Sequence, residues 1–154
     1  MTPIEYVQEF VLPTLLQSKR DRRSRYWAYL SCLVIWHIKD YLESAGETSI
    51  NERLHEQVGM HFAVVRGVAN GAKHERTKRP HEIPFESGSD WFRPPAVAGQ
   101  LQCGLSRLGD IDGGREFEFA SQRHDIYISA CSVLLAFAEC YPNHLADCDV
   151  TSFL

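Results

Sequence analysis

Tyr26-Trp-Ala-Tyr-Leu-Ser-Cys-Leu-Val-Ile-Trp-His-Ile38 is the stretch that decides the fold of this chain. It is apolar at most positions and is interrupted by Ser31 and His37. A helix that is apolar on most sides is covered by other elements. The stretch is also shorter than the roughly 20 residues that span a bilayer. We therefore predict a central helix of a helical bundle from about Arg22 to Glu43, ended by Ala45-Gly46.

Three further helices are predicted around this central one. The first begins at Pro3 with Thr2 as its cap, and Pro13 is expected to kink or split it. The second runs over about residues 50–74, capped by Thr48 or Ser49, with Gly59 as the point where it would break. The third covers about residues 121–141, with Ser121 as its cap and Pro142 as its end.

The segment before the last helix changes character. Prolines at positions 80, 84, 94 and 95 exclude a continuous helix. Residues 101–108 and 115–119 alternate apolar and polar side chains around the turn 110–114, which predicts a β-hairpin. The expected fold class is therefore mainly α: a four-helix bundle with a long loop and a β-hairpin, about residues 75–120, inserted before the last helix. Residues 1–154 are expected to form a single domain.

The composition is that of an ordinary globular protein. The 154 residues are 44% hydrophobic and 23% charged, with a net charge of −4. No apolar run is long enough for a membrane span, and no signal peptide is visible at the first residues, so a cytoplasmic protein is expected. The five cysteines form no CxxC pair and read as buried reduced thiols. No metal and no cofactor are expected.

Arg66-Gly-Val-Ala-Asn-Gly-Ala-Lys-His74 places four polar side chains on one stripe of a helix. Such a stripe is normally apolar. His74 is the candidate acid–base group, and Lys73 beside it would lower the pKa of the imidazole. Asn70 could orient a phosphate or the imidazole, and Arg66 could neutralise developing negative charge. The alternative is a hydrogen-bonded network that closes the bundle.

His37 and Asp40 form a second polar pair, three residues apart on the central helix. A carboxylate near an imidazole raises its pKa and sets its tautomer. If this face meets the polar stripe, Asp40 could pair with Arg66, Lys73 or His74 in a supporting role. The simpler alternative is a buried structural ion pair between Asp40 and Arg66.

Two basic clusters contain nine of the sixteen lysines and arginines of an acidic chain. Clustered cations on one surface are typical of phosphate and nucleic-acid binding. The alternative is a solvated helix end, although cations suit the start of a helix poorly. The nucleic-acid-binding candidates are Lys19, Arg20, Arg22, Arg23 and Arg25 in the first cluster and Arg76, Lys78 and Arg79 in the second, which also contains Lys73.

The helix order, the basic clusters and the segment Val68-Ala-Asn-Gly-Ala-Lys-His74 resemble HEPN-like helical-bundle proteins of bacteria and phages. Trp36-His37 ahead of Asp40-Tyr41 adds to this likeness, which covers about residues 22–75. The resemblance implies a four-helix bundle, often dimeric, and for many members metal-independent RNase or toxin activity. The HEPN signature places Arg and His closer together, whereas seven residues separate Arg66 from His74 here.

Two functional hypotheses follow. In the first, the chain is a HEPN-like protein that binds or cleaves RNA or nucleotide phosphates, as a metal-independent RNase of a defence or toxin system. In the second, it is a non-enzymatic interaction or regulatory module, in which the polar stripe is structural and Trp91, Phe92 and Phe117 form a contact surface. The sequence leaves open whether the protein is an enzyme. Expected partners are RNA, a nucleotide, a second copy of the chain or another protein, and no membrane.

Overall fold

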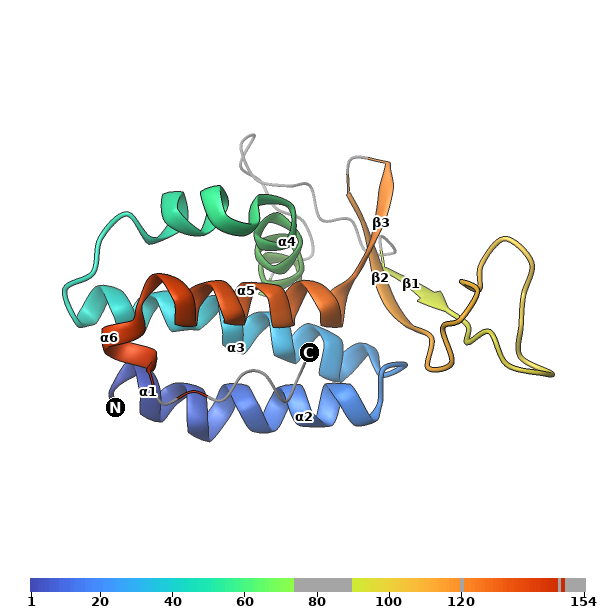
Figure 1. Cartoon of the computed structure of the whole chain (residues 1–154), viewed down its shortest axis with the longest axis horizontal. Helices are drawn as coiled ribbons and strands as arrows, with labels where there is room; N and C mark the ends of the chain where they lie inside the picture. The colour runs from blue at the N-terminus through green and yellow to red at the C-terminus, as the bar shows by residue number, and fades with distance from the viewer. Residues whose placement is uncertain (74–89, 120, 147, 149–154) are drawn as a thin grey trace.

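The computed structural model describes residues 1–73, 90–119, 121–146 and 148, without the side chain of Lys73. The prediction of a mainly helical chain is confirmed, and a small three-stranded antiparallel sheet lies at one end of the helices (Figure 1). The elements are α1 (Pro3–Tyr6), η1 (Val7–Val11), α2 (Leu12–Arg20), α3 (Arg25–Ser44), α4 (Ile50–Lys73), β1 (Asp90–Arg93), β2 (Gly114–Phe119), β3 (Gln122–Asp125), α5 (Ile126–Cys140) and α6 (Pro142–Leu145).

The first helical run extends from α1 through η1 to α2. The predicted cap at Thr2 is confirmed, because its hydroxyl accepts from the Glu5 amide at 3.3 Å and the Glu5 carboxylate accepts from the Thr2 amide at 2.7 Å. The run from α1 through η1 to α2 continues without a break (Figure 1), although it contains Pro13. The π-helical η1 precedes α2, and Pro13 lies in its first two positions, where a missing N–H removes no helical bond.

α3 is the central helix, as predicted, and packs against α2, α4 and α5. Its Ile35, Ile38 and Leu42 side chains are fully buried. The helix begins at Arg25 rather than at Arg22, because the Ser24 hydroxyl accepts from the Trp27 amide at 3.3 Å and caps it there. The three preceding residues therefore form a turn between α2 and α3.

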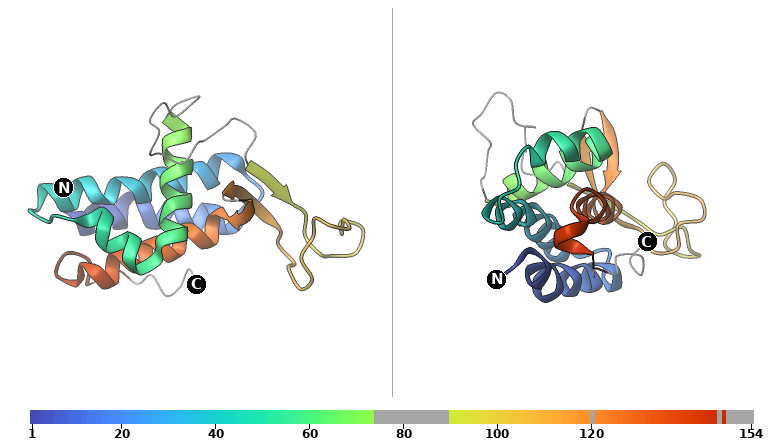
Figure 2. Two further views of the ribbon diagram at one scale, coloured as in Figure 1. Left: turned by 90° about the horizontal axis from the view of Figure 1, so that it is seen from above. Right: turned by 60° about the vertical axis from the view of Figure 1, so that its left-hand side comes forward.

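α4 bends sharply at Val58, where φ is −139° and ψ is 33°. This is one residue before the break that the sequence suggested at Gly59. Figure 2 shows that the two halves of α4 run in different directions and that the second half crosses α3 and α5. The second half buries Phe62, Val65 and Ala69 in the core. α5, the most apolar helix, packs most extensively against α4.

The predicted hairpin between residues 101–108 and 115–119 is wrong. The strand at Gly114–Phe119 is present, but β2 pairs with β1 on one side and β3 on the other. Residues 101–108 form turns and bends, and Leu108 is 100% exposed. An alternating pattern produces a stable strand only when one of its faces is buried, and the leucines of this segment have no such cover.

The last long helix begins at Ile126, not at Ser121 as predicted. Ser121 has a positive φ of 61° next to β3 and does not cap a helix. β3 follows it, and the Asp125 carboxylate caps α5 by accepting from the Ile128 amide at 3.0 Å. This arrangement places the start of α5 directly beside the sheet.

Candidate functional site: a basic hollow beside the sheet

The described part of the polar stripe consists of Arg66 and Asn70 on the second half of α4, both partly buried. The Arg66 guanidinium lies 5.8 Å from the centre of the Trp36 ring, and that ring lies 5.6 Å from the ring of Phe62. The remaining candidates lie outside the described residues: the Lys73 side chain, His74, Arg76, Lys78 and Arg79. Arg66 of α4 therefore contacts α3 through the ring of Trp36.

His37 and Asp40 form the predicted pair, with 2.7 Å between Nδ1 and Oδ2. Both side chains are more than one third exposed, and Lys39 also lies 3.6 Å from the Asp40 carboxylate. The expected buried ion pair between Asp40 and Arg66 is wrong, because Asp40 is at the surface. An exposed pair of this kind contributes little to stability.

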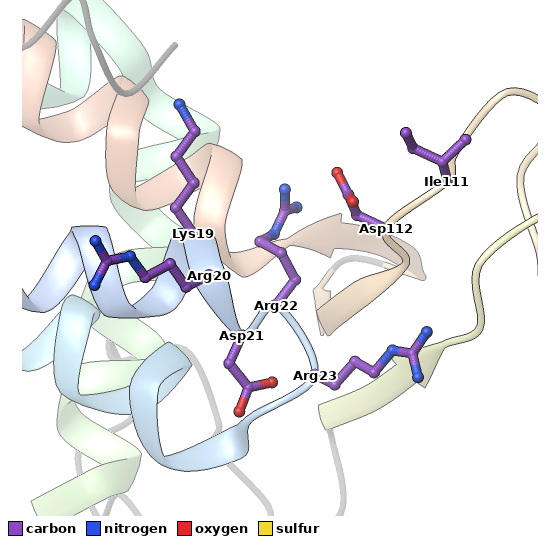
Figure 3. A pocket seen from close by; sticks show the side chains of 7 residues that line it. All are labelled: Lys19, Arg20, Asp21, Arg22, Arg23, Ile111 and Asp112. Carbon is purple, nitrogen blue, oxygen red and sulfur yellow. The ribbon is translucent and has the colours of Figure 1, made fainter.

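A hollow of about 220 Å³ lies at the turn between α2 and α3, and Lys19, Arg20, Arg22 and Arg23 of the first basic cluster line it (Figure 3). Lys19 and Arg20 are exposed in the last turn of α2, where cations suit the helix dipole. The cluster thus spans one helix end and the following turn rather than only the start of α3. The hollow is lined by Lys19, Arg20, Asp21, Arg22, Arg23, Ile111 and Asp112.

The arginines of this cluster differ in what they contact. Arg22 lies 2.7 Å from the Asp125 carboxylate and its guanidinium covers the Tyr127 ring at 4.4 Å. Arg25 does not line the hollow and pairs with Asp90 of β1 at 3.0 Å. The carboxylates of Asp125 and Asp90 partly balance the charges of these two arginines. Both ion pairs connect the region between α2 and α3 to the sheet. The cations at the rim are Lys19, Arg20 and Arg23, all exposed.

Arg93 is the centre of an ion network that the sequence did not predict. Its side chain is 4% exposed and contacts three carboxylates. Nε lies 2.6 Å from Asp110, Nη1 lies 2.5 Å from Glu116, and Nη2 lies 2.7 Å from Asp125. Burial alone would lower the pKa of Arg93. The hydrogen bonds and charges of the three carboxylates raise the pKa by more than burial lowers it, so the pKa lies above its ordinary value.

Two further arginines complete the network. Arg107 lies 2.7 Å from Glu116, and Arg22 shares the Asp125 carboxylate with Arg93. Three arginines therefore face three carboxylates, and the charges balance. The network joins β1, β2, the cap of α5 and the turn after α2.

Asp110 fixes the turn that contains Ile111 and Asp112, which line the hollow on the side of the β1–β2 loop. Its second carboxylate oxygen accepts from the Asp112 amide at 3.2 Å and from the Gly113 amide at 2.9 Å. Ile111 and Asp112, which line the hollow, lie within this turn. Gly113 has a φ of 69°, and an added Cβ would lie 2.4 Å from the Arg93 carbonyl oxygen, so only glycine fits there. The ion network thus positions both sides of the hollow.

β1 also carries two exposed aromatic side chains. Trp91 is 41% exposed and Phe92 is 40% exposed. The Arg123 guanidinium lies 4.2 Å from the centre of the Trp91 ring. Phe117, predicted as part of the same contact surface, is fully buried in the core, so that part of the prediction is wrong.

A histidine pair lies where α4, α5 and β3 meet. His61 Nδ1 lies 3.2 Å from the Ser129 hydroxyl, which itself donates to the Asp125 carbonyl at 2.8 Å. His61 Nδ1 therefore carries the proton and donates to Ser129. Burial and, to a lesser extent, the nearby His124 lower the pKa of His61. Protonation of His61 is therefore disfavoured in the folded chain.

Comparisons with protein-family models, curated proteins and solved structures find no match for this chain. In the part that the structure describes, no helix has the length and apolar character to cross a bilayer. The same residues contain no group of three or more His, Cys, Asp or Glu side chains placed to hold a metal ion.

Proposed function

We propose that the protein binds phosphate groups of RNA or of a nucleotide in the basic hollow. The observation that supports this proposal is the set of cations at its rim, Lys19, Arg20 and Arg23. Cationic side chains gathered around a surface depression supply charge-assisted hydrogen bonds to phosphate oxygens. The hollow is smaller than the roughly 300–1,000 Å³ of pockets for drug-sized ligands, so a phosphate group fits it better than a whole small molecule.

The distribution of charge favours few phosphate contacts. The chain carries a net charge of −4, yet this end of the molecule collects cations. Such an asymmetry steers anions to one place on an acidic protein. Asp21 and Asp112 also line the hollow and reduce the local excess. We therefore expect a modest affinity with a shallow salt dependence, because the slope scales with the number of phosphate contacts.

The resemblance to HEPN-like proteins extends this proposal to cleavage. In that case the run α1–α2 with α3, α4 and α5 would represent a HEPN-like four-helix bundle. His74 would act as acid–base, with Arg66, Asn70 and Lys73 as its neighbours. An RNA-cleavage assay in EDTA comparing the wild type with His74→Ala tests this extension. Equal activity in both, or none in either, removes the cleavage step and leaves the binding proposal standing.

The binding proposal is tested by fluorescence anisotropy with a labelled single-stranded RNA. The double variant Lys19→Gln/Arg20→Gln removes two rim cations. We expect weaker binding and a salt dependence that is shallower by about 0.7 logarithmic units per lost phosphate contact. The control is Lys39→Gln/Arg53→Gln, which changes the net charge equally at the other end of α3 and on the first half of α4 (Figure 1). Equal effects of the two double variants, or no binding by the wild type, would refute the proposal.

A second candidate function is a protein-interaction module, which the loop between β1 and β2 favours. This loop projects from the sheet end of the molecule (Figure 1). Its aliphatic side chains are exposed: Leu101 by 55%, Leu105 by 39%, Leu108 by 100% and Ile111 by 70%. Exposed apolar patches commonly mark interaction surfaces. If a second copy of the chain binds here, light scattering should show a dimer for the wild type and a monomer for Leu108→Asp.

A further inference from the structure

Phe92 lies on β1 and its ring contacts Arg23, which lines the basic hollow. It belongs to β1, directly opposite Arg115 of β2 in the strand register. The Arg115 guanidinium lies 5.7 Å from the centre of the Phe92 ring and that of Arg23 lies 5.9 Å from it. The residue is still 40% exposed. Phe92 is therefore a partly exposed ring with two guanidinium groups over it.

Arg23 connects this ring to the hollow. It lines the hollow and also lies over Phe92, and Figure 3 shows its side chain reaching from the turn toward β1. Arg115 fixes the same turn, because its Nε donates to the Arg23 carbonyl at 2.8 Å. A phosphate in the hollow and a flat group on Phe92 would thus be neighbours, both in contact with Arg23.

We infer that this surface takes single-stranded RNA, with a phosphate in the hollow and an adjacent base stacked on Phe92. The inference rests on the proposed function and names its ligand. Proteins that bind single strands combine a cationic groove for the backbone with aromatic side chains on which unpaired bases stack. The hollow supplies cations and Phe92 supplies the ring, and Arg23 both lines the hollow and lies over the ring.

A duplex does not fit this arrangement. Its bases are stacked on one another, and the deep, narrow major groove of an RNA helix does not admit side chains. Phe92 could reach no base of such a helix without unstacking it. The few cations at the rim, with Asp21 and Asp112 among them, also offer less than the long cationic surface that a duplex backbone needs.

Trp91 provides a matched control on the same strand. It is 41% exposed, nearly as much as Phe92, and also lies beneath an arginine, Arg123. Side chains alternate between the two faces of a strand, so Trp91 lies on the face opposite to Phe92. It therefore has the same chemistry as Phe92 without the contact to Arg23 and the hollow.

The test compares Phe92→Leu with Trp91→Leu, because leucine removes the ring and keeps apolar bulk. Binding is measured by anisotropy to a single-stranded RNA, to the duplex of the same sequence and to an abasic strand of the same length. We expect Phe92→Leu to weaken binding of the single strand about five-fold or more, and Trp91→Leu less than about two-fold. Phe92→Tyr should bind as the wild type does. The wild type should bind the abasic strand about as weakly as Phe92→Leu binds the complete one.

The outcomes separate this inference from the proposed function. Equal affinity of the wild type for duplex and single strand would overturn the inference, as would equal losses in the two leucine variants. If Lys19→Gln/Arg20→Gln weakens binding while Phe92→Leu does not, phosphate binding stands and the stacking platform is refuted. If the wild type binds none of the three strands, the proposed function itself fails. Melting temperatures of both leucine variants check that each one is folded.

Discussion

The helical body and the sheet end of this molecule are held together by different physical interactions. In the body, Ile35, Leu54 and Phe137 are almost completely buried among apolar neighbours. At the sheet end, the central contacts are instead the ion pairs of Arg93 with its three carboxylates. Apolar packing is non-directional and tolerates adjustment, whereas a buried ion network fixes the direction of each partner. The sheet end is therefore the part whose geometry can position a binding surface.

The largest predicted effect comes from breaking the network at its centre. Arg93→Met removes the main partner of the buried carboxylates of Glu116 and Asp125 and of the partly buried carboxylate of Asp110. We expect the free energy of unfolding to fall by about 3–5 kcal/mol, measured by urea denaturation. Arg107→Gln is the control, because the Arg107 side chain is 53% exposed, and it should cost less than about 1 kcal/mol. Similar small losses in both variants would show that the network is not central.

The helical body should respond differently to a comparable loss. Leu54→Ala removes buried apolar atoms and is expected to lower the free energy of unfolding by about 2–5 kcal/mol. Because Leu54 lies in the first half of α4, away from the hollow, RNA affinity of the folded fraction should be unchanged. Arg93→Met, in contrast, should weaken RNA binding as well, since it releases the turn with Asp112. An affinity loss in Leu54→Ala equal to that in Arg93→Met would contradict this separation of roles.

The cap of α3 gives a smaller effect at the junction of the two regions. Ser24→Ala removes the hydroxyl that accepts from the Trp27 amide. We expect a loss of about 1 kcal/mol in the free energy of unfolding. Ser44→Ala is a control at the other end of the same helix, where the hydroxyl donates to the Asp40 carbonyl and caps no free amide. It should change stability by less than Ser24→Ala does.

The two regions should also lose stability in different pH ranges. Burial and His124 lower the pKa of His61, so protonation favours the unfolded chain. The stability that neutral His61 contributes is complete above about pH 6.5 and is lost as the pH falls through its lower folded value. Burial raises the pKa of Asp110, but the Gly113 amide and Arg93 outweigh this and lower it overall. Its contribution is therefore lost only below about pH 4.

The variant His61→Gln tests whether His61 causes the loss of stability between pH 7 and pH 5. An amide keeps a donor for the Ser129 hydroxyl but does not titrate. Urea denaturation between pH 7 and pH 5 should show a smaller decline in stability for His61→Gln than for the wild type. The decline below pH 4 should stay the same in both. An unchanged slope between pH 7 and pH 5 would exclude His61 as its source.

Features set by local patterns could be predicted from the sequence. The cap at Thr2, the central position of α3, the break in α4 and the strand β2 all follow from residue spacing within short windows. The pairing of the sheet could not be predicted in the same way. Residues 101–108 alternate as convincingly as a strand, but the partners of β2 are determined by which faces are buried, and that depends on the whole fold.

The candidate site was predictable only in part. The basic cluster around residues 19–25 was visible, but its division into anchors such as Arg22 and exposed cations such as Arg20 depends on distant partners. Arg93 lies 17, 23 and 32 positions from its three carboxylates, so no spacing rule connects them. The alternation of Glu116 with Phe117 predicts that this carboxylate lies on the polar face of the strand, so the sequence pattern carries no signal of its burial.

The central claim is that RNA contacts the basic hollow and Phe92, and ultraviolet cross-linking to single-stranded RNA followed by mass spectrometry tests it most directly. The account predicts cross-linked peptides that contain residues 19–25 and Phe92, and their loss in Lys19→Gln/Arg20→Gln. Cross-links confined to the first half of α4 or to α6, or cross-links that are unchanged in the double variant, would contradict it.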